Sequence, residues 1–518
     1  MTTTALHQAL LTPRTYPHPT THVEFQETHI SRLYLTDQYV YKLKKSLDLG
    51  FLDFTTLDQR HHYCKEELRL NSRYAPDTYL TVVTINCADG HYTINGAGEV
   101  VEYAVMMKRL PRERMLDDLI ENDAPHLAAE MVRLAGQLVD FHQAAPPVHP
   151  PAPVFCSTMR GNWRENITQT RPYLGTTLPA CGIRYLRFWL ANFYRHHRRV
   201  LRQREQSGFI RELHGDLHAE HICLTDPIQI YDCIEFNLRF RQIDIADELA
   251  FLIMDLEYRD RADLANALLA AYQHKVTMEL TAELLRFYRV YRAWVRGKVE
   301  SFLSADRDVP DAVRNRASQR ARRYFNLALG DMCQPSLVLV SGLMGVGKST
   351  LARSLTRSSR ALLLRSDQIR KGLVVNSRDT NKSAFGAGIY SDSISELTYR
   401  HMRELAGTAL AKGQTVIVDA SFSRRAERDA FRDEARRHRL PCHLLHLHCR
   451  SKVALQRLAA RHRAGTDISD GRPELYRQQR EHFEPISPAE NPVEIETNDD
   501  NEKLVGQALC AILEGQYR

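Results

Sequence analysis

The sequence has no apolar run approaching the roughly 18 residues that a membrane-spanning helix requires. Residues 1–20 also lack the basic start and the long apolar core of a secretory signal. The ten cysteines are scattered without a C-x-x-C framework, which favours free thiols in a reducing compartment over a disulfide scaffold. We therefore expect no membrane segment and a cytoplasmic location.

A large excess of one charge is also missing, because 70 basic residues stand against 63 acidic ones and leave a net charge of +7. The densest basic stretches, residues 195–199 and 314–323, lie in helix-forming sequence and lack the interleaved aromatic residues that stack on bases. This mild charge is compatible with anionic substrates such as ATP, but it does not indicate nucleic acid. We expect both stretches to be solvated helix faces or contacts between domains. No pattern in the sequence sets an oligomeric state.

The chain is too long, at 518 residues, for a single hydrophobic core. Gly330 and Pro335 interrupt helix-forming sequence, and we place a domain boundary between them. The predicted units are residues 1–108, residues 109–330 and residues 336–518.

A phosphate-binding loop is the clearest motif of the chain. Four apolar residues, 337–340, run into residues 342–349, GLMGVGKS, which match the pattern G-x-x-x-x-G-K-[ST] at every defined position. Glycines let backbone N–H groups converge on phosphate oxygens, Lys348 reaches the β- and γ-phosphates, and the Ser349 hydroxyl is a ligand for Mg²⁺. A turn that binds nothing is disfavoured because a strand precedes the motif and a helix follows it. The predicted nucleotide-binding residues here are Gly342, Gly345, Gly347, Lys348, Ser349 and Thr350.

Two acidic residues follow later strands of the same half. Residues 361–365 form a predicted strand that leads into Asp367, which is placed to activate a substrate hydroxyl as a general base. Residues 416–418 form another strand that ends at Asp419, a Walker-B-type acid for Mg²⁺.

Arg457 and Arg461 stand four residues apart on a predicted helix and therefore share one face, where both could stabilise the transferred phosphoryl group. Equally, both side chains could be solvated. Residues 376–391 are rich in Gly, Ser and Asn and suit a substrate flap. Residues 442–449 contain Cys and His, but they lack the spacing of a structural zinc motif and are predicted to be a plain strand.

The N-terminal part begins with a predicted pair of strands over residues 22–44, and Lys42 closes the second. The period of two puts Lys42 on the face that a kinase-type strand lays against ATP. Lys44 shares that face and is a rival candidate. Glu67, on the next predicted helix, is a candidate ion-pair partner for the lysine, with Glu66 as its competitor. Each of these residues, taken alone, could be an ordinary surface charge.

Two carboxylates further along complete this set. Asp216 lies in the stretch His-Gly-Asp of residues 214–216, and Asp232 ends a short predicted strand. A kinase needs such a pair, because one carboxylate accepts the proton of the attacking hydroxyl while the other holds Mg²⁺ on the phosphates.

Residues 22 to about 300 resemble the aminoglycoside phosphotransferase family, relatives of the protein kinases. The family's catalytic loop reads H-G-D-x-x-x-x-N, and its metal-binding acid follows on the next strand. Asp216 and Asp232 match these two acids, whereas His221 stands where the family has Asn. The family's Gly-rich loop is also absent, which leaves phosphate contact to the Thr28 and Ser31 hydroxyls or to nearby backbone.

His221 is assigned as a metal ligand together with Asp232. Mg²⁺ prefers hard oxygen ligands, whereas imidazole suits softer ions, so we expect one tight Mg²⁺ on Asp232 and a gain from Mn²⁺ at this site. The structural alternative is that His221 donates a hydrogen bond to Asp216 or to a backbone carbonyl and never contacts a metal.

Residues 336–518 resemble the P-loop kinases of small metabolites and of polynucleotide 5′-hydroxyls. The tandem order resembles bacterial fusions of an aminoglycoside-phosphotransferase-like domain with an ATP-binding P-loop kinase. The resemblance implies an α+β protein-kinase-like bilobal fold followed by an α/β P-loop fold with a parallel sheet. It also implies a bifunctional ATP-dependent kinase that phosphorylates a hydroxyl. The alternatives are an N-terminal nucleotide sensor that regulates the P-loop kinase, and a P-loop domain that is a nucleic-acid end-processing or toxin-like kinase.

Overall fold

The structure is a computed structural model that describes residues 4–50, 52–148, 154–375, 392–464 and 473–517. The segment at residues 376–391, where we predict a substrate flap, lies outside these described residues. By its packing the chain divides into a first unit, Met1–Met159 with His197–Arg289, and a second unit, Arg160–His196 with Val290–Arg518. No helix in the described ranges is long and apolar enough to cross a bilayer.

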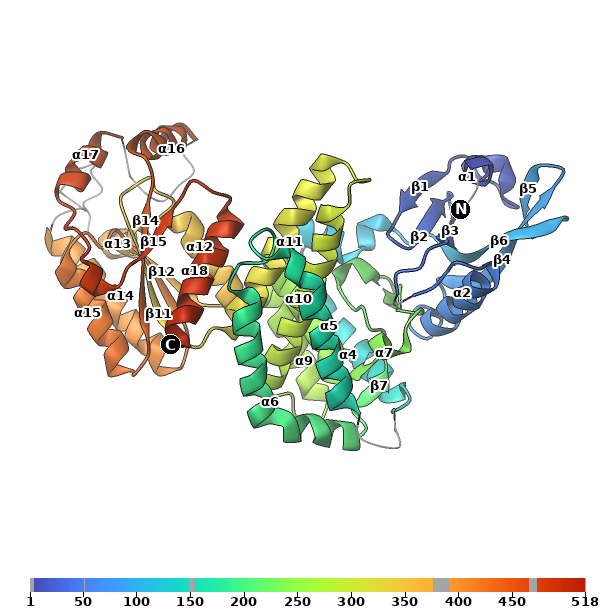
Figure 1. Cartoon of the computed structure of the whole chain (residues 1–518), viewed down its shortest axis with the longest axis horizontal. Coiled ribbons are helices and arrows are strands. Elements are labelled where there is room, and N and C mark those ends of the chain that lie inside the picture. Colours follow the sequence, from blue (N-terminus) through green and yellow to red (C-terminus); the bar gives the residue numbers. More distant parts are fainter. Residues whose placement is uncertain (1–3, 51, 149–153, 376–391, 465–472, 518) are drawn as a thin grey trace. The chain divides into compact units, whose positions relative to one another are not determined.

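A six-stranded antiparallel sheet begins the first unit (Figure 1). Its hydrogen-bonded neighbours follow the order β1-β2-β3-β6-β4-β5. Helix α2 (Leu57–Asn71) packs against β4 and β6, and it begins with a capping box in which Thr56 accepts a hydrogen bond from the Gln59 amide. The strands are β1 (Glu24–Glu27), β2 (Ser31–Leu35), β3 (Tyr39–Lys44), β4 (Tyr79–Ala88), β5 (His91–Ile94) and β6 (Glu99–Lys108).

Residues 22–44 form three strands, so the prediction of two strands was wrong. The Thr28 amide donates a hydrogen bond to the Ser31 carbonyl at 2.9 Å, and this tight turn separates β1 from β2. The turn contains no glycine, so the run of β-branched and aromatic residues continued through it and concealed it.

Alternation along β3 places its two lysines on one face. Tyr41 and Leu43 pack into the sheet's main apolar cluster. Val40 faces the other way into a second cluster, and Lys42 and Lys44 follow it at the period of two. Both lysines are buried, with 7% and 2% of their surface exposed. Buried lysines need negative partners, which the site supplies.

Two short antiparallel strand pairs in the first unit border the segments that contain the other predicted site residues. Strand β7 (Ile210–Glu212) pairs with β10 (Gln242–Asp244), and β8 (Ile222–Cys223) pairs with β9 (Gln229–Ile230). The catalytic-loop segment lies between β7 and β8, and Asp232 follows β9. The helices of this unit include α1 (Thr4–Leu10), α3 (Leu116–Glu121), α4 (Leu127–Ala144), α7 (Leu238–Arg241), α8 (Ile245–Tyr258) and α9 (Ala262–Lys275).

Asp244 caps the N-terminus of α8. Its side chain accepts a hydrogen bond from the Ala246 amide at 2.8 Å. The same carboxylate also accepts hydrogen bonds from Arg204 at 2.6 and 2.7 Å and from the Tyr288 hydroxyl at 2.9 Å. Its burial is therefore compensated by both a cation and neutral donors.

A five-stranded parallel sheet forms the centre of the second unit, in the order β12-β13-β11-β14-β15. All residues of the middle strand, β11, are buried. Figure 1 shows helices on both faces of this sheet. The strands are β11 (Leu337–Ser341), β12 (Leu362–Arg365), β13 (Val416–Asp419), β14 (Cys442–His448) and β15 (Val493–Glu496). Strand β14 covers residues 442–448 of the stretch 442–449 that was predicted to be a plain strand, and Cys449 follows its end.

Helices α5 (Phe155–Thr170), α6 (Gly182–Gln206) and α10 (Ala282–Ala305) have residues in both units. The remaining helices of the second unit are α11 (Asp311–Met332), α12 (Lys348–Ser359), α13 (Ser366–Val375), α14 (Asp392–Ala411), α15 (Arg425–Arg437), α16 (Ser451–Ala464), α17 (Pro473–Glu481) and α18 (Asn501–Gln516).

Gly330 lies inside α11 and does not end it, so its interpretation as a helix stop was wrong. A Cβ atom at this position would lie 2.0 Å from the Ser358 carbonyl oxygen. The glycine is therefore required because α11 approaches the end of α12 closely. The helix continues to Met332.

Cys181 and Cys510 form a disulfide within the second unit, with their Cα atoms 5.7 Å apart. The expectation of free thiols was therefore wrong for this pair. Eight other cysteines are free in the described chain. The two bonded residues are 329 positions apart, so no local spacing motif could indicate the bond.

Candidate active sites

Lys42, Glu67 and Asp232 meet in the first unit. Lys42 Nζ lies 2.7 Å from Glu67 Oε1 and also pairs with Asp232 Oδ1. Lys42 comes from β3, Glu67 from α2, and Asp232 from the segment after β9. Glu66 instead pairs with Arg69 on the same helix, at 2.8 Å. The geometry therefore favours Glu67 over its competitor.

Lys44, the rival to Lys42, belongs to the same ion network. Its Nζ lies 2.8 Å from Glu67 Oε2 and pairs with Glu235 Oε1. Glu67 thus gives one carboxylate oxygen to each lysine. Sequence reasoning missed Glu235, which stands three residues after Asp232 and 191 residues from its partner Lys44.

Burial and paired charges oppose each other in this network. Burial alone would lower the pKa of Lys42, but Asp232 and Glu67 outweigh it and hold that pKa well above its ordinary value. Burial raises the pKa of the Glu67 carboxyl, and the two lysines overcome it so that the net pKa is lowered. Asp232 likewise has a lowered pKa, because Lys42 outweighs burial. For Glu235 burial dominates, and its pKa is raised.

The backbone conformation of Asp232 leaves its carboxylate partly exposed. Its φ angle is +66°, and its amide donates a hydrogen bond to the Tyr79 hydroxyl at 3.1 Å. The next amide, of Cys233, donates to Asn71 Oδ1 at 2.8 Å. The Asp232 side chain is 38% exposed. An ionised, partly exposed carboxylate fits the hard oxygen ligand that Mg²⁺ prefers.

Asp216 lies in the loop between β7 and β8, beside two histidines. Its Oδ2 atom is 3.6 Å from His218 Nε2 and 3.7 Å from His221 Nδ1. His221 Nδ1 donates a hydrogen bond to the Asp216 backbone carbonyl at 2.9 Å. The other ring nitrogen, Nε2, lies 3.6 Å from Asp232 Oδ2. The structure therefore contains the predicted backbone hydrogen bond and also turns the second nitrogen toward the predicted metal ligand.

Burial, followed by the neighbouring His218, lowers the pKa of His221 to about 4. The ring is consequently neutral at physiological pH, which is the form that coordinates metals.

A buried carboxylate on α8 holds the backbone of the Asp216 loop. Glu248 accepts hydrogen bonds from the amides of His214 and Gly215, at 3.3 and 2.8 Å. Its Oε1 atom is 3.4 Å from His142 Nε2, and the opposite ring nitrogen of His142, Nδ1, lies 2.7 Å from the Tyr272 hydroxyl. Sequence reasoning missed Glu248 and His142, because neither belongs to a motif.

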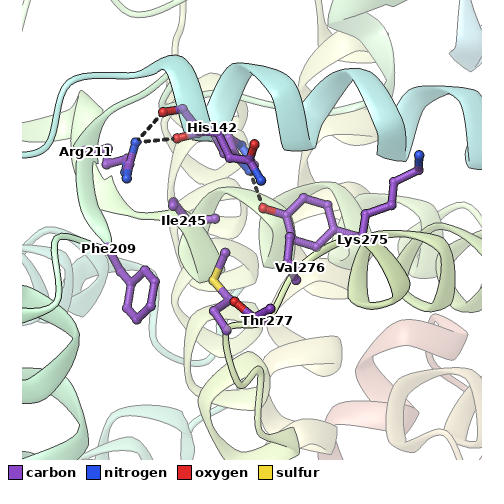
Figure 2. Close-up of a pocket in the computed structure, with 10 residues that line it drawn as sticks. His142, Phe209, Arg211, Ile245, Lys275, Val276 and Thr277 are labelled. Carbon is purple, nitrogen blue, oxygen red and sulfur yellow. Dashed lines mark hydrogen bonds between the residues drawn. The ribbon is translucent and has the colours of Figure 1, made fainter.

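His142 and Tyr272 also line a pocket of about 200 Å³ (Figure 2). Arg211 donates hydrogen bonds to the carbonyls of His142 and Gln143, at 2.9 and 2.8 Å, and so closes the end of α4. No described lining residue of this pocket is one of the predicted site residues. The lining residues are His142, Gln143, Phe209, Arg211, Ile245, Tyr272, Lys275, Val276, Thr277 and Met278.

The turn between β1 and β2 replaces the Gly-rich loop. The Thr28 hydroxyl accepts from the Ser31 amide at 3.0 Å, and Ser31 is fully buried. The Thr28 side chain therefore stabilises the turn, and burial keeps the Ser31 hydroxyl from solvent. Of the two predicted sources of phosphate contact, this geometry favours nearby backbone over the hydroxyls.

The P-loop of the second unit joins the end of β11 to the start of α12. Gly342 and Gly347 have φ angles of +141° and +99°, which only glycine adopts readily, and Gly345 lies between them at +77°. Lys348, Ser349 and Thr350 form the first turn of α12, so their amides point out of the helix N-terminus.

Lys348 folds back onto its own loop, where Nζ donates a hydrogen bond to the Leu343 carbonyl at 2.8 Å. Burial lowers the pKa of this lysine, while Asp419 and Asp367 oppose the shift and Arg461 adds to it. Both predicted acids and one predicted arginine therefore lie close enough to Lys348 to act on its charge. Lys348, Asp367 and Asp419 stand at or just after the carboxyl ends of the neighbouring strands β11, β12 and β13.

Asp419 and Asp367 each have an arginine partner. Strands β12 and β13 pair Arg365 with Asp419, and Arg365 Nε lies 3.4 Å from Asp419 Oδ2. Asp367, in the first turn of α13, accepts a hydrogen bond from Arg370 at 3.0 Å. Neither arginine was predicted.

Arg457 contacts the rim of the P-loop. Its guanidinium donates to the Thr497 hydroxyl at 3.0 Å and to the Thr497 carbonyl at 2.7 Å. The Thr497 hydroxyl in turn donates to the Val346 carbonyl of the P-loop at 2.7 Å. The interpretation of Arg457 as a freely solvated side chain is therefore not favoured. Thr497 lay outside every motif and was missed.

Gln479, on α17, also reaches the P-loop. Its side-chain oxygen accepts a hydrogen bond from the Met344 amide at 2.7 Å. Leu343 and Met344 pack against a small apolar cluster that includes Leu458 of α16 and Tyr476 of α17. Helices α16 and α17 thus border the loop that the sequence assigns to nucleotide.

Comparison with known families matches two segments of the chain. Residues 64–289 match the phosphotransferase enzyme family, and residues 337–486 match an AAA domain. The matches confirm the resemblance drawn from the sequence: a segment that resembles the phosphotransferase enzyme family precedes a segment that resembles an AAA domain. The fold class is also confirmed: an α+β protein-kinase-like bilobal domain precedes an α/β P-loop domain with a parallel sheet.

Three uncharacterized mycobacterial proteins, one from Mycobacterium bovis and two from strains of Mycobacterium tuberculosis, resemble the chain over most of its length. Each is 29% identical over 419 residues, which are 78% of this chain and 80% of the relative.

Three solved structures each resemble about a third of the chain. An unliganded sugar kinase from Janibacter is 19% identical over 34% of this chain and 92% of its own, with a TM-score of 0.27. A gluconokinase from Sinorhizobium meliloti is 21% identical over 36% and 98%, with a TM-score of 0.26. The APS kinase of Mycobacterium tuberculosis, solved with AMPPNP and APS, is 19% identical over 35% and 99%, with a TM-score of 0.26.

Proposed function

We propose that the chain is a bifunctional ATP-dependent phosphotransferase in which each domain moves the γ-phosphate of ATP to a hydroxyl. The acceptor is a small molecule or a nucleic acid that the site does not specify. The observation that supports this most is the placement of Lys348, Asp367 and Asp419 at or just after the carboxyl ends of three neighbouring parallel strands, β11, β12 and β13. We assign one phosphoryl transfer to residues 1–330 and the other to residues 336–518. We place both reactions in the cytoplasm.

In the P-loop domain, backbone amides at the start of α12 bind the phosphates and Lys348 leaves the Leu343 carbonyl to meet them. Asp367 accepts the proton of the attacking hydroxyl, with its carboxylate oriented by Arg370. Arg461, together with Arg457 at the rim, stabilises the charge that develops on the phosphoryl group. Ser349 and Asp419 would hold Mg²⁺, which neutralises phosphate charge when bound.

In the protein-kinase-like domain, Lys42 binds phosphate oxygens and is oriented by Glu67. Asp216 accepts the proton of the acceptor hydroxyl, because its side chain is partly exposed and its loop is fixed by Glu248. Asp232, with His221 beside it, would hold Mg²⁺, and Mn²⁺ is the alternative ion for a site that contains an imidazole.

The test uses the full chain with one site disabled at a time. Wild type, Lys348→Ala, Asp216→Asn and the double variant are incubated with γ-labelled ATP and pools of metabolites and oligonucleotides. We expect each single variant to lose a different set of labelled products and the double variant to lose all of them. If Asp216→Asn changes no product, the first domain is not a phosphotransferase and a nucleotide-sensing role replaces it.

Labelled oligonucleotides would identify the second domain as a nucleic-acid kinase. Such binding should weaken steeply as salt rises, because Lys and Arg contacts to phosphates release counterions.

A further inference from the structure

The catalytic loop of the first domain gathers three side chains that bind metals. Ligand atoms of Asp216, His218 and His221 all lie within 4.8 Å of one another. No other such group of three His, Cys, Asp or Glu residues occurs in the described part of the chain. Two ligands that share one ion at about 2.1 Å stand roughly 3.0–3.5 Å apart. The 3.6 Å between Asp216 Oδ2 and His218 Nε2 is therefore nearly short enough for both atoms to bind one ion.

The orientation of His221 fits a metal ligand. Because Nδ1 donates to the Asp216 carbonyl at 2.9 Å, the neutral ring carries its lone pair on Nε2. A backbone carbonyl that fixes the second nitrogen in this way is the usual support of a metal-binding histidine. Asp232 Oδ2 lies 3.6 Å from Nε2, so a second carboxylate borders the group.

The surroundings admit a cation from one side. The side chains of His218 and His221 are 2% and 14% exposed, whereas that of Asp216 is 32% exposed. The nearby cation of Lys42 is already shared between Glu67 and Asp232. Two imidazoles and two carboxylates suit first-row transition ions, whereas Mg²⁺ favours sites built only from oxygen.

We propose that Asp216, His218 and His221, with Asp232 beside them, form a binding site for a divalent transition-metal ion such as Zn²⁺ or Co²⁺. The site exists independently of nucleotide. Its consequence for activity rests on the proposed function: an ion on Asp216 occupies the carboxylate that accepts the substrate proton. Zn²⁺ or Co²⁺ therefore inhibits the first domain, whereas Mg²⁺, with Mn²⁺ as its alternative, supports it.

Co²⁺ is the probe, because its visible absorption reports nitrogen and oxygen ligands directly. The full chain is titrated with Co²⁺ in an excess of Mg²⁺, as wild type, His218→Asn and His221→Asn. We expect each variant to weaken Co²⁺ binding about tenfold or more. The matched control is His446→Asn on β14, which removes a histidine that pairs with Glu494 in the second unit, and it should leave this signal unchanged. Equal Co²⁺ affinities in wild type and both variants would overturn the proposal.

A second measurement needs no variant. X-ray absorption of the Zn²⁺-loaded wild type should show ring scattering from two histidines, and its absence refutes the site. Phosphoryl transfer by the Lys348→Ala protein, in which only the first domain is active, then separates the metal site from the proposed function. If Zn²⁺ binds through the histidines but does not inhibit this phosphoryl transfer, the inhibitory consequence is contradicted. If transfer stays absent after chelation, the proposed function fails while the metal site stands.

Discussion

Replacing Lys44 by methionine tests the ion network beneath the first site. The substitution keeps the length of the side chain and removes its charge. Lys44 is almost completely buried, and its Nζ contacts Glu67 Oε2 at 2.8 Å and Glu235 Oε1. Methionine would leave Glu235 buried without its cation. Removing one partner of a buried ion pair costs about 3–5 kcal/mol of unfolding free energy.

For a domain of this size, that loss corresponds to a fall of roughly 6–20 °C in melting temperature. Scanning calorimetry of the full chain measures the shift, and hydrogen exchange at β3 and α2 assigns it to this part of the structure. The matched control is Lys45→Met, because the adjacent Lys45 forms only a partly exposed pair with Glu27 at 3.1 Å. That change should cost less than about 1 kcal/mol.

The loss of stability caused by Lys44→Met should change with pH in a defined direction. Burial already raises the pKa of Glu235, and loss of Lys44 raises it further. Above the ordinary carboxyl pKa of about 4.3, the folded state then holds a proton that the unfolded state has lost, so stability falls as pH rises. The deficit of Lys44→Met should be largest near neutral pH and smallest in mild acid. Adding Glu235→Gln should restore part of it. A deficit that is equal at both pH values, or equal to that of Lys45→Met, would refute the reasoning.

Asp367→Asn should lower turnover of the P-loop domain by about 10² or more with little change in ATP affinity, and an equal fall in affinity would make Asp367 a ligand instead. Thr497→Val should weaken ATP binding about 5- to 10-fold, because it removes the hydroxyl between Arg457 and the Val346 carbonyl, whereas Thr497→Ser should retain wild-type affinity in the same titration. Thiol reductant should destabilise the second unit by about 2–5 kcal/mol, and Cys181→Ser should abolish that sensitivity in thermal melts.

Local patterns predicted the parts of the sites that depend on neighbouring residues. The P-loop is contiguous, so its glycines and Lys348 could be assigned from spacing alone. Lys42 could be assigned from the period of two along its strand, although β3 continues beyond it to Lys44, and Asp232 could be assigned from its place just after a short strand. The backbone geometry of a loop or a strand determines where these residues stand, so the spacing of a few neighbouring residues is enough to recognise them.

Contacts between distant positions could not be predicted in this way. Lys44 and Glu235 are 191 residues apart, and only the folded lobe shows that Glu67 is shared between two lysines. Gly330 was interpreted as a helix stop from the sequence alone. A glycine is required there because the Ser358 carbonyl, which belongs to another helix, approaches closely. Glu248 carries no motif at all, since its role is to accept backbone hydrogen bonds.

The bond between Cys181 and Cys510 turns most of the chain into a covalent circle. The circle encloses Asp216, Asp232 and the whole P-loop, since all lie between the two cysteines. A single peptide cleavage inside it opens the circle but releases no fragment until a thiol is added. Gel mobility with and without reductant after limited proteolysis would show this directly. Cutting the gene between the two domains would instead place the bonded cysteines on separate polypeptides.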